Sequence, residues 1–290
     1  AAAGSYLGLF AYLQDGAVIR NLRIEDPLLE GEQAEGHSAA GALAGAGAGA
    51  LIENVQVSGD WCAQAGLDIS SVGALVGSVS STELVDCLAS GNVGSSAGAF
   101  QYVGGLVGTT WESDIIRCAF DGNVASDGEA GGGVGGFAGG GEIRESRASG
   151  SVIGNNQVGG LVADLEADVV DSYAEMDVTT GVESFSHAGG LSGKTCGSRV
   201  RRAWVAGSLA GANRWGVTSY STCNDPNDAA DVFWDVELSA VGTDGVADDL
   251  GAVGYSTEHM MQQASFTNFD FDTVLRMDEG ADYPRLRWEP

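Results

Sequence analysis

Lysine, histidine and long apolar runs are scarce in this sequence, and each shortage narrows what the protein can be. One lysine (Lys194) and twelve arginines stand against 40 acidic residues, which gives a net charge of −27. A charge of that sign repels nucleic-acid phosphates and anionic membranes, so we expect no nucleic acid partner. No run reaches the roughly 18 apolar residues of a membrane helix, so we expect no membrane insertion within this segment.

The near absence of lysine beside abundant carboxylates favours a protein from a high-salt, halophilic organism. Carboxylates hold hydrated cations, and molar salt screens their mutual repulsion within about 3 Å. The alternative is an acidic surface protein from an ordinary habitat.

Patterns for metal and nucleotide sites are missing. The five cysteines show no CxxC or CxxH spacing, and His37, His187 and His259 are not paired at metal spacing. Residues 131–136 fit GxGxxG by letter, but they fall within a repeat rather than between a strand and a helix. We therefore expect no catalytic residue and no cofactor, with weak binding of Ca²⁺ by loop carboxylates left open.

The cysteines themselves divide into two groups. Cys87 and Cys118 take the same position in successive repeats, which predicts small buried side chains in one interior column. Cys196 and Cys223 lie in the irregular C-terminal part and could close a loop of 27 residues, so a disulfide between them is a candidate. Cys62 has no evident partner.

Glycine, at 46 residues, is abundant and forms a repeat of the type Gly-Gly-Leu-Val-Gly. Counted from Gly8 in the first copy and from the first glycine of each later copy, successive copies are 33, 32, 31, 31, 24 and 30 residues apart, so the unit is about 31 residues long. The seven copies are Leu7–Ala11, Gly41–Gly45, Gly73–Gly77, Gly104–Gly108, Gly135–Gly139, Gly159–Ala163 and Gly189–Gly193.

Each repeat continues with alternating aliphatic and polar residues, which is the pattern of a β-strand. Most copies close on a small-Gly-polar-aliphatic group such as Ser90–Val93. Such strands cannot bury a face alone, so the repeats predict an all-β, parallel β-solenoid, a right-handed β-helix of about seven coils. The first predicted inward column is Leu43, Leu75, Leu106, Phe137, Leu161 and Leu191. The second is Ile52, Val85, Ile116, Ile143, Val170 and Val200.

The repeat pattern breaks at about Gly211, which predicts repeats over residues 1–210 and an insertion and capping region over 211–290. Residues 212–230 have the composition of an insertion, and the tail after them is rich in aromatic residues. A short helix is expected from Ser256 or Thr257. Aromatic side chains suit a cap, because the last coil would otherwise expose its backbone and core.

These repeats resemble the GLUG-motif repeat family of bacterial and archaeal surface proteins, and the resemblance covers nearly the whole chain. The third to fifth copies match best, whereas the sixth ends in Ala163 instead of glycine. The tail is also similar to sequences that follow such repeats, at Phe233–Asp235, Thr257–Met261, Phe269–Phe271 and Tyr283–Trp288. The resemblance implies a β-helical fold and an extracellular, often adhesive, setting at the cell surface, and it supplies no catalytic residues.

Surface contacts are expected where the repeat is interrupted. Trp61, Trp111 and Trp215 fall in turns or insertions, where they could stack on sugar rings or on a neighbouring protein, or fold back over their own coil. The first coil begins close to the start of the sequence, at Leu7, Leu9 and Phe10, so it is predicted to have an unpaired edge. An upstream segment of a longer protein or another copy of the chain would cover that edge, and repeated contacts between copies would give a filament.

Charged residues also recur at fixed repeat positions. Asp86 and Arg117 are equivalent in adjacent coils, as are Arg144, Asp171 and Arg201, which favours a ladder of alternating charges. Carboxylates on adjacent coils are also what a polysaccharide lyase or hydrolase on a β-helix uses.

The sequence thus predicts a non-catalytic, structural or adhesive module of a cell-surface protein from a high-salt organism. Its expected partners are copies of itself, neighbouring segments of a larger protein, or glycans. The alternatives are a polysaccharide-cleaving enzyme and a glycan-binding module.

Overall fold

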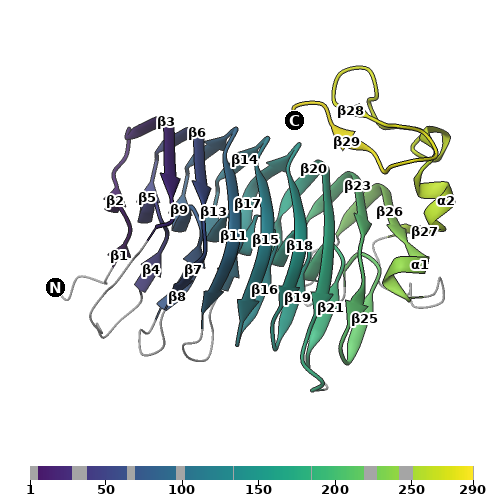
Figure 1. Ribbon diagram of the computed structural model, residues 1–290, viewed down its shortest axis with the longest axis horizontal. Helices are drawn as coiled ribbons and strands as arrows, with labels where there is room; N and C mark the ends of the chain where they lie inside the picture. The colour runs from purple at the N-terminus through teal and green to yellow at the C-terminus, as the bar shows by residue number, and fades with distance from the viewer. Residues whose placement is uncertain are drawn as a thin grey trace.

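The computed structural model describes residues 6–27, 38–63, 69–95, 102–132, 134–183, 185–218, 227–241 and 251–289. Only the backbone is described at residues 38, 61–63, 69, 70 and 95. The chain winds into a parallel β-solenoid whose coils stack along the long axis of the molecule (Figure 1). The all-β fold expected from the repeats is therefore confirmed.

One side of the solenoid is an eight-stranded parallel sheet, here called sheet A. It runs along the lower edge of the rod in Figure 1. Its strands, in order, are β1 (Tyr6–Leu7), β4 (Ser38–Ala40), β8 (Ile69–Gly73), β12 (Tyr102–Gly104), β16 (Glu129–Gly131), β19 (Gln157–Gly159), β21 (His187–Gly189) and β25 (Asn213–Trp215).

The other strands form a 19-stranded sheet, sheet B, which bends into two faces. The near face follows sheet A in each coil and holds β2 (Phe10–Leu13), β5 (Ala44–Ala48), β9 (Val76–Ser80), β13 (Val107–Trp111), β22 (Ser192–Thr195) and the first halves of β17 (Gly135–Arg144) and β20 (Val162–Thr179). The far face holds the second halves of β17 and β20 together with β3 (Val18–Glu25), β6 (Leu51–Ser58), β10 (Glu83–Val85), β11 (Leu88–Ser95), β14 (Asp114–Ile116), β15 (Ala119–Ser126), β18 (Arg147–Ile153), β23 (Arg199–Ala206), β26 (Asp228–Asp235) and β27 (Val253–Tyr255). Two short strands, β7 (Trp61–Ala63) and β24 (Leu209–Ala210), extend its edge.

The first inward column confirms the prediction at every position except one. Its buried members are Leu43, Leu75, Leu106, Val134, Leu161 and Leu191, joined by Val217. The prediction of Phe137 was wrong, because Gly135 pairs with Val107 and Phe137 with Thr109, which turns the Phe137 ring outward. The glycine-rich run 131–136 allowed two alignments. In the observed strand register, Gly131 pairs with Gly104 on one side and with Gly159 on the other. These two repeats are therefore 27 and 28 residues long, rather than the 31 and 24 residues expected from the sequence.

The second inward column shifts by one residue in three coils. Leu84, Ile115 and Val169 point into the core, whereas Val85, Ile116 and Val170, which we predicted, take the next position and face outward. Two aliphatic residues stand side by side in each of these coils, so alternation alone could not choose between them. The pairing of Leu84 with Ile52 and of Ile115 with Ile143 decides the register.

One corner of the coils is glycine in three successive coils, before Met176 takes the equivalent position in the next coil. Gly91, Gly122 and Gly150 stack in register with φ values of 119°, 158° and 120°. A Cβ on Gly122 would lie 2.0 Å from the carbonyl oxygen of Gly91, so no other residue fits at this stacking distance. This explains the glycine of the small-Gly-polar-aliphatic group.

A second corner is built from polar residues in the left-handed conformation. Its eight members have φ between 48° and 59°, and asparagine and aspartate tolerate this conformation better than most residues. Adjacent members pair along the rod, as in Asn54 with Asn21 and Arg117 with Asp86. The column consists of Asn21, Asn54, Asp86, Arg117, Glu145, Asp171, Arg202 and Asp231.

The coil lattice continues past residue 210, since β25 pairs with β21 and β26 pairs with β23. Parts of the predicted insertion 212–230 are therefore coil strands, and its residues 219–226 lie outside the described residues. After α1 (Val236–Ser239), strand β27 adds to β26, and the tail continues through α2 (Thr257–Met260) and a 3₁₀ turn at Gln263–Ser265. Ser256 caps α2, as expected from the sequence.

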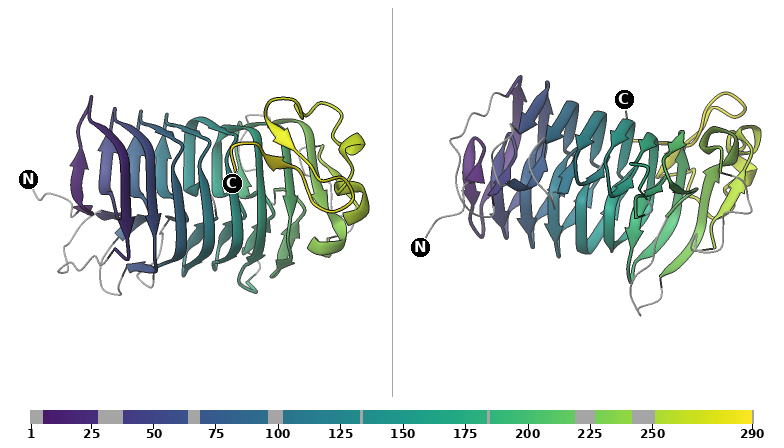
Figure 2. Two further views of the ribbon diagram at one scale, coloured as in Figure 1. Left: turned by 45° about the horizontal axis from the view of Figure 1, so that its top comes forward. Right: turned by 90° about the horizontal axis from the view of Figure 1, so that it is seen from below.

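The tail then folds back along the outside of the rod instead of ending over its last coil (Figures 1 and 2). It forms the small antiparallel pair β28 (Leu275–Arg276) and β29 (Arg285–Leu286). Its aromatic residues cover an outward row of the far face, Tyr173, Trp204 and Phe233. The predicted aromatic cap is thus a strap that holds the flank of the last coils as well as their end.

The opposite end of the rod is bare within the part of the chain that the structure describes. Strands β1, β2 and β3 pair on one side only, with β4, β5 and β6. Leu9 and Phe10 are 61% and 40% exposed there, whereas Leu7 is half-buried. None of the described helices combines the length and the apolar character needed to cross a membrane.

Candidate functional site: an acid–aromatic corner

The outward faces of sheet A and the near face of sheet B meet at a concave corner. The last glycine of the repeat unit makes this approach possible, because a Cβ on Gly108 would lie 2.5 Å from the backbone nitrogen of Val72. Farther out, the hydroxyls of Ser71 and Thr109 are 2.6 Å apart across the corner. Side chains from both sheets therefore converge along the rod.

Three aromatic rings occupy the middle of this corner. Phe137 is almost fully buried, with its ring centroid 5.5 Å from that of Tyr102 and 4.7 Å from that of Trp111. Trp111 remains 51% exposed. A Cβ on Gly139 would lie 2.8 Å from the Trp111 ring, so the ring leans over that glycine, toward the coil that carries Glu166.

Acidic residues follow the rings in the next coils. By strand register, Glu129 is the neighbour of Tyr102, and Asp164 is the neighbour of Phe137. Asp164 is followed by Lys194, whose Nζ donates to Asp164 Oδ2 at 2.6 Å. We name the set Tyr102, Trp111, Glu129, Phe137, Asp164, Glu166 and Lys194 the acid–aromatic corner.

The carboxylates influence one another across the corner. Burial raises the pKa of Glu129 to about 7, and the charge of Asp164 adds to this effect, while Lys194 and the Tyr102 hydroxyl oppose it. Burial also raises the pKa of Asp164 despite its ion pair with Lys194. Burial and the carboxylates of Glu129 and Asp164 together raise the pKa of Tyr102.

Several oxygen atoms in this region lack a donor among the described residues. They are Glu129 Oε2, Asp164 Oδ1 and, one coil farther along sheet A, Gln157 Oε1. Asp164 is only 3% exposed, and its other oxygen is used by Lys194. Buried polar atoms in proteins are nearly always hydrogen-bonded, so three acceptors without a donor and with almost no accessible surface set this region apart from the rest of the described coils.

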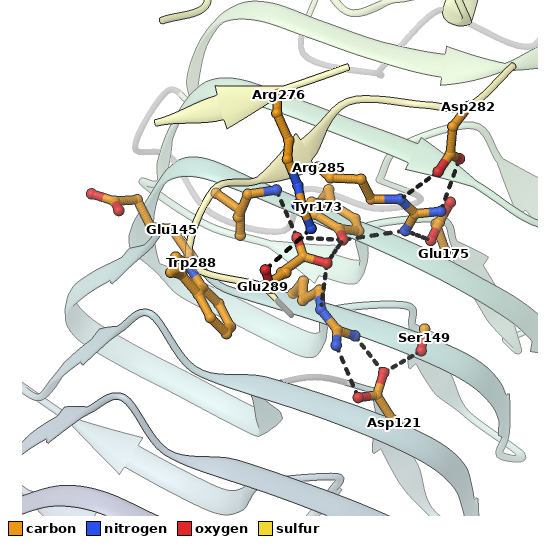
Figure 3. Close-up of polar contacts among 12 residues, drawn as sticks. Asp121, Glu145, Ser149, Tyr173, Glu175, Arg276, Asp282, Arg285, Trp288 and Glu289 are labelled. Carbon is orange, nitrogen blue, oxygen red and sulfur yellow. Dashed lines mark hydrogen bonds and ion pairs between the residues drawn. The ribbon is translucent and has the colours of Figure 1, made fainter. Parts of the chain in front are cut away.

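A second polar cluster lies where the tail crosses the far face, and we call it the tail clamp (Figure 3). Arg285 is paired with Glu175 and Asp282 and donates to the Tyr173 hydroxyl. Arg147 is paired with Asp121 and with Glu289, at 3.1 Å from the latter. The Trp288 indole donates to the Glu145 carbonyl oxygen at 2.9 Å.

The clamp and the corner differ in how their charges are satisfied. In the clamp, acidic and basic groups from the tail and the coils pair with each other around a cavity of about 380 Å³. Such mutual pairing is what a fastening between two segments needs. The corner instead combines unused acceptors with an exposed ring, so it is the better candidate for a binding site.

The tryptophans singled out from the sequence lie in strands rather than in turns. Trp61 belongs to β7, and its side chain lies outside the described residues. Trp111 ends β13 and enters the corner, which leaves it placed for a surface contact. Trp215 ends β25, where its ring is half-buried and 5.7 Å from that of His187.

The cysteines are placed as follows. Cys87 and Cys118 are free, buried and stacked in adjacent coils, which confirms the predicted column. Cys196 forms a disulfide. Cys223, its predicted partner, lies outside the described residues, so that pairing stays a prediction, and no side chain is described for Cys62.

The predicted ladder of alternating charges is present, but some of its ion pairs join other residues than the sequence suggested. The Asp86–Arg117 pair is confirmed, with Arg117 Nε 2.6 Å from Asp86 Oδ1. Asp171, however, pairs with Arg202 and not with Arg144 or Arg201, because the left-handed corner brings positions 171 and 202 together. Arg201 pairs with Asp228 instead, and Arg144 with Glu142.

The remaining sequence motifs carry no site chemistry. Gly131 and Gly132 are stacked coil residues, which confirms the repeat interpretation of the GxGxxG letters. His187 is half-buried in β21 and His259 lies on α2, while His37 is outside the described residues. Among the described residues, no three histidine, cysteine, aspartate or glutamate side chains are grouped to hold a metal ion, and weak Ca²⁺ binding stays a prediction.

The sequence interpretation missed the corner except for Trp111. The acidic residues are too numerous for any one to stand out, and Phe137 was assigned to the core. The one available signal was Lys194, the single lysine of the chain.

No family model matches this chain, and no curated protein matches its sequence. Among solved structures, a chain described as IgA1 protease is similar at 16% sequence identity and a TM-score of 0.41. The match covers 70% of this chain and 17% of that one, so the chain spans less than a fifth of that protein. A likeness this distant concerns the β-helical fold and says nothing of activity.

Proposed function

We propose that the chain is a rigid, non-catalytic module of an extracellular cell-surface protein from a high-salt organism, with a structural or adhesive role. The observation that carries this proposal is the difference between the two ends of the rod. One end is covered by β27 and held by the tail clamp, whereas at the other the described strands β1, β2 and β3 have one edge without a partner among the described residues and carry exposed apolar side chains. The resemblance of the repeats to the GLUG-motif family supports the surface setting.

The bare edge is suited to continued stacking. Unpaired strands offer backbone donors and acceptors to another strand, and Leu9, Phe10 and Val18 add apolar contacts. Either a preceding coil of a longer protein or a second copy would satisfy them. The far end also exposes Leu238 and Val253, so repeated contact between copies would give a head-to-tail filament.

Sedimentation velocity in molar NaCl tests the assembly part of this proposal, because salt removes the repulsion between copies of a −27 chain. We expect species that grow with protein concentration. The double variant Leu9→Lys/Val18→Lys should remain monomeric, whereas Ile153→Lys, at an equally exposed position in the middle of the rod, should behave as the parent. A parent chain that is monomeric at every concentration would contradict head-to-tail assembly.

The corner favours one second candidate, a polysaccharide hydrolase or lyase. Glu129 and Asp164 are electrostatically coupled, and glycosidases use two carboxylates of which one is protonated. Release of reducing ends from neutral polysaccharides in molar salt would support this candidate if Glu129→Gln abolishes it. Equal release by the variant and the parent would rule out Glu129 as the acid.

A further inference from the structure

The acid–aromatic corner brings a ring face and acceptor oxygens within a few coils of each other. The half-exposed indole of Trp111 lies over Gly139 of the next coil. Glu166 pairs with Gly139 one coil farther on, so Trp111, Gly139 and Glu166 form one outward row. Glu129 and Asp164 come from the two sheets that form the corner. A ligand that bridges them must present an apolar face on one side and polar groups on the other.

The polar groups of that ligand must include hydrogen-bond donors. The atoms without a partner among the described residues, on Glu129, Asp164 and Gln157, are all oxygens. Two of these side chains are carboxylates, which accept hydrogen bonds when ionised, and the third atom is an amide oxygen. The Asp164 side chain is 4% exposed and is held by Lys194, so it fixes the local charge of the corner, whereas Glu129 is partly exposed.

The charge of the surroundings restricts the ligand further. The carboxylates of Glu129, Asp164 and Glu166 lie at the corner itself, where even molar salt screens little, and they disfavour uronate, sialylated and sulfated saccharides. A cationic peptide would meet the ammonium group of Lys194 beside Asp164. A neutral saccharide meets neither obstacle, since its hydroxyls donate and the carbon face of its ring is apolar.

We propose that the acid–aromatic corner binds a neutral saccharide, with one ring stacked on the half-exposed Trp111 and its hydroxyls donating to the partly exposed carboxylate of Glu129. This inference rests on the adhesive role proposed above and names the ligand class for it. The Phe137 ring packs against the indole and is itself packed against Tyr102, so the Trp111 ring is held in place for stacking.

Calorimetric titration of the whole chain in molar NaCl tests this inference. The probes are maltohexaose, cellohexaose, mannohexaose and galactohexaose, with hexagalacturonate as the anionic counterpart and an arginine-rich hexapeptide as the cationic one. We expect at least one neutral hexasaccharide to bind and the anionic one not to bind. Trp111→Ala should weaken binding at least tenfold and Trp111→Phe less, while Ile153→Ala, which removes an equally exposed apolar side chain, should leave it unchanged.

The outcomes separate this inference from the function on which it rests. Absence of binding by all four neutral probes, or binding unaffected by Trp111→Ala, overturns the inference. Binding of the hexapeptide alone would identify the corner as a peptide site and overturns it as well. Because Trp111 lies far from the bare edge, Trp111→Ala should leave sedimentation unchanged, so the assembly proposal stands or fails separately.

Discussion

The hydroxyl of Tyr173 donates to both carboxylate oxygens of Glu289, at 2.8 Å each, although the two residues are 116 positions apart in the chain. Tyr173 belongs to an outward row of the far face, and its ring stacks on Trp204 at 4.2 Å between centroids. The end of the tail is thereby fixed to a coil well inside the rod. The tail clamp joins coils that otherwise touch only their neighbours, and it should raise the cooperativity of unfolding at this end.

Replacement of Glu289 tests the clamp. Glu289→Gln removes the charge that faces Arg147 in a pair whose side chains are 8% and 11% exposed. We expect a loss of about 3 kcal/mol in the free energy that holds the tail down, at the low end for a buried pair because Arg147 keeps Asp121. Amide hydrogen exchange of residues 251–289 measures the change in this free energy.

The control for the clamp is Glu83→Gln, which makes the same chemical change on an exposed strand of a distant coil. It should leave exchange of the tail unaltered. Equal exchange of the tail in Glu289→Gln and the parent would show that the apolar contacts of the tail suffice.

Two glycines allow a matched test of coil stacking. In Gly91→Ala the new Cβ would lie 2.1 Å from the Gly59 carbonyl oxygen at φ 119°, so the coils must separate locally. We expect a loss of about 3 kcal/mol or more in unfolding free energy. Gly16→Ala meets no atom within 4 Å at φ 77° and should cost only about 1 kcal/mol, from the conformation alone. Denaturant unfolding compares the two, and similar losses would contradict the close stacking at Gly91.

The raised pKa of Glu129 predicts a particular pH dependence of stability. Its pKa is raised from 4.5 to about 7 on folding, so the folded state binds more protons than the unfolded state between these values. The stability contributed by protonated Glu129 is therefore complete below about pH 4.5 and is lost as the pH rises to about 7. Glu129→Gln should remove this slope, of roughly 3 kcal/mol in total.

Unfolding free energies of the parent and Glu129→Gln, measured in molar salt from pH 4.5 to 8, check this expectation. The difference between the two proteins should change across the window and level off above it. A constant difference would mean that Glu129 titrates as an exposed glutamate does.

Salt should stabilise the fold. Thirteen basic residues can neutralise at most thirteen of the 40 acidic ones, so repulsion outweighs the ion pairs that salt also weakens. We expect the native circular dichroism to be lost on dialysis from molar to low salt. Full retention of the spectrum in dilute buffer would contradict the high-salt origin.

Local sequence signals predicted the class of fold and several details of it. The recurring leucines and the stacked pair Cys87 and Cys118 follow from the repeat period, the helix after Ser256 follows from neighbouring residues, and the structure confirms all three. Local alternation failed where it was ambiguous, at the paired aliphatics such as Leu84 and Val85 and in the glycine run 131–136. There, hydrogen bonding between coils selects one register, and a one-residue shift sends a side chain to the opposite face.

By itself, then, the sequence determined that about 31 residues make one coil and that the coils stack through a leucine column. These properties repeat, so each copy reinforces the same signal. The tertiary structure alone decided that Phe137 joins Trp111 outside the core, that Glu129 meets Asp164 and Lys194 at the corner, and that Glu289 reaches Tyr173. Those contacts occur once, between segments whose distance in sequence carries no period, and only the stacked register brings them together.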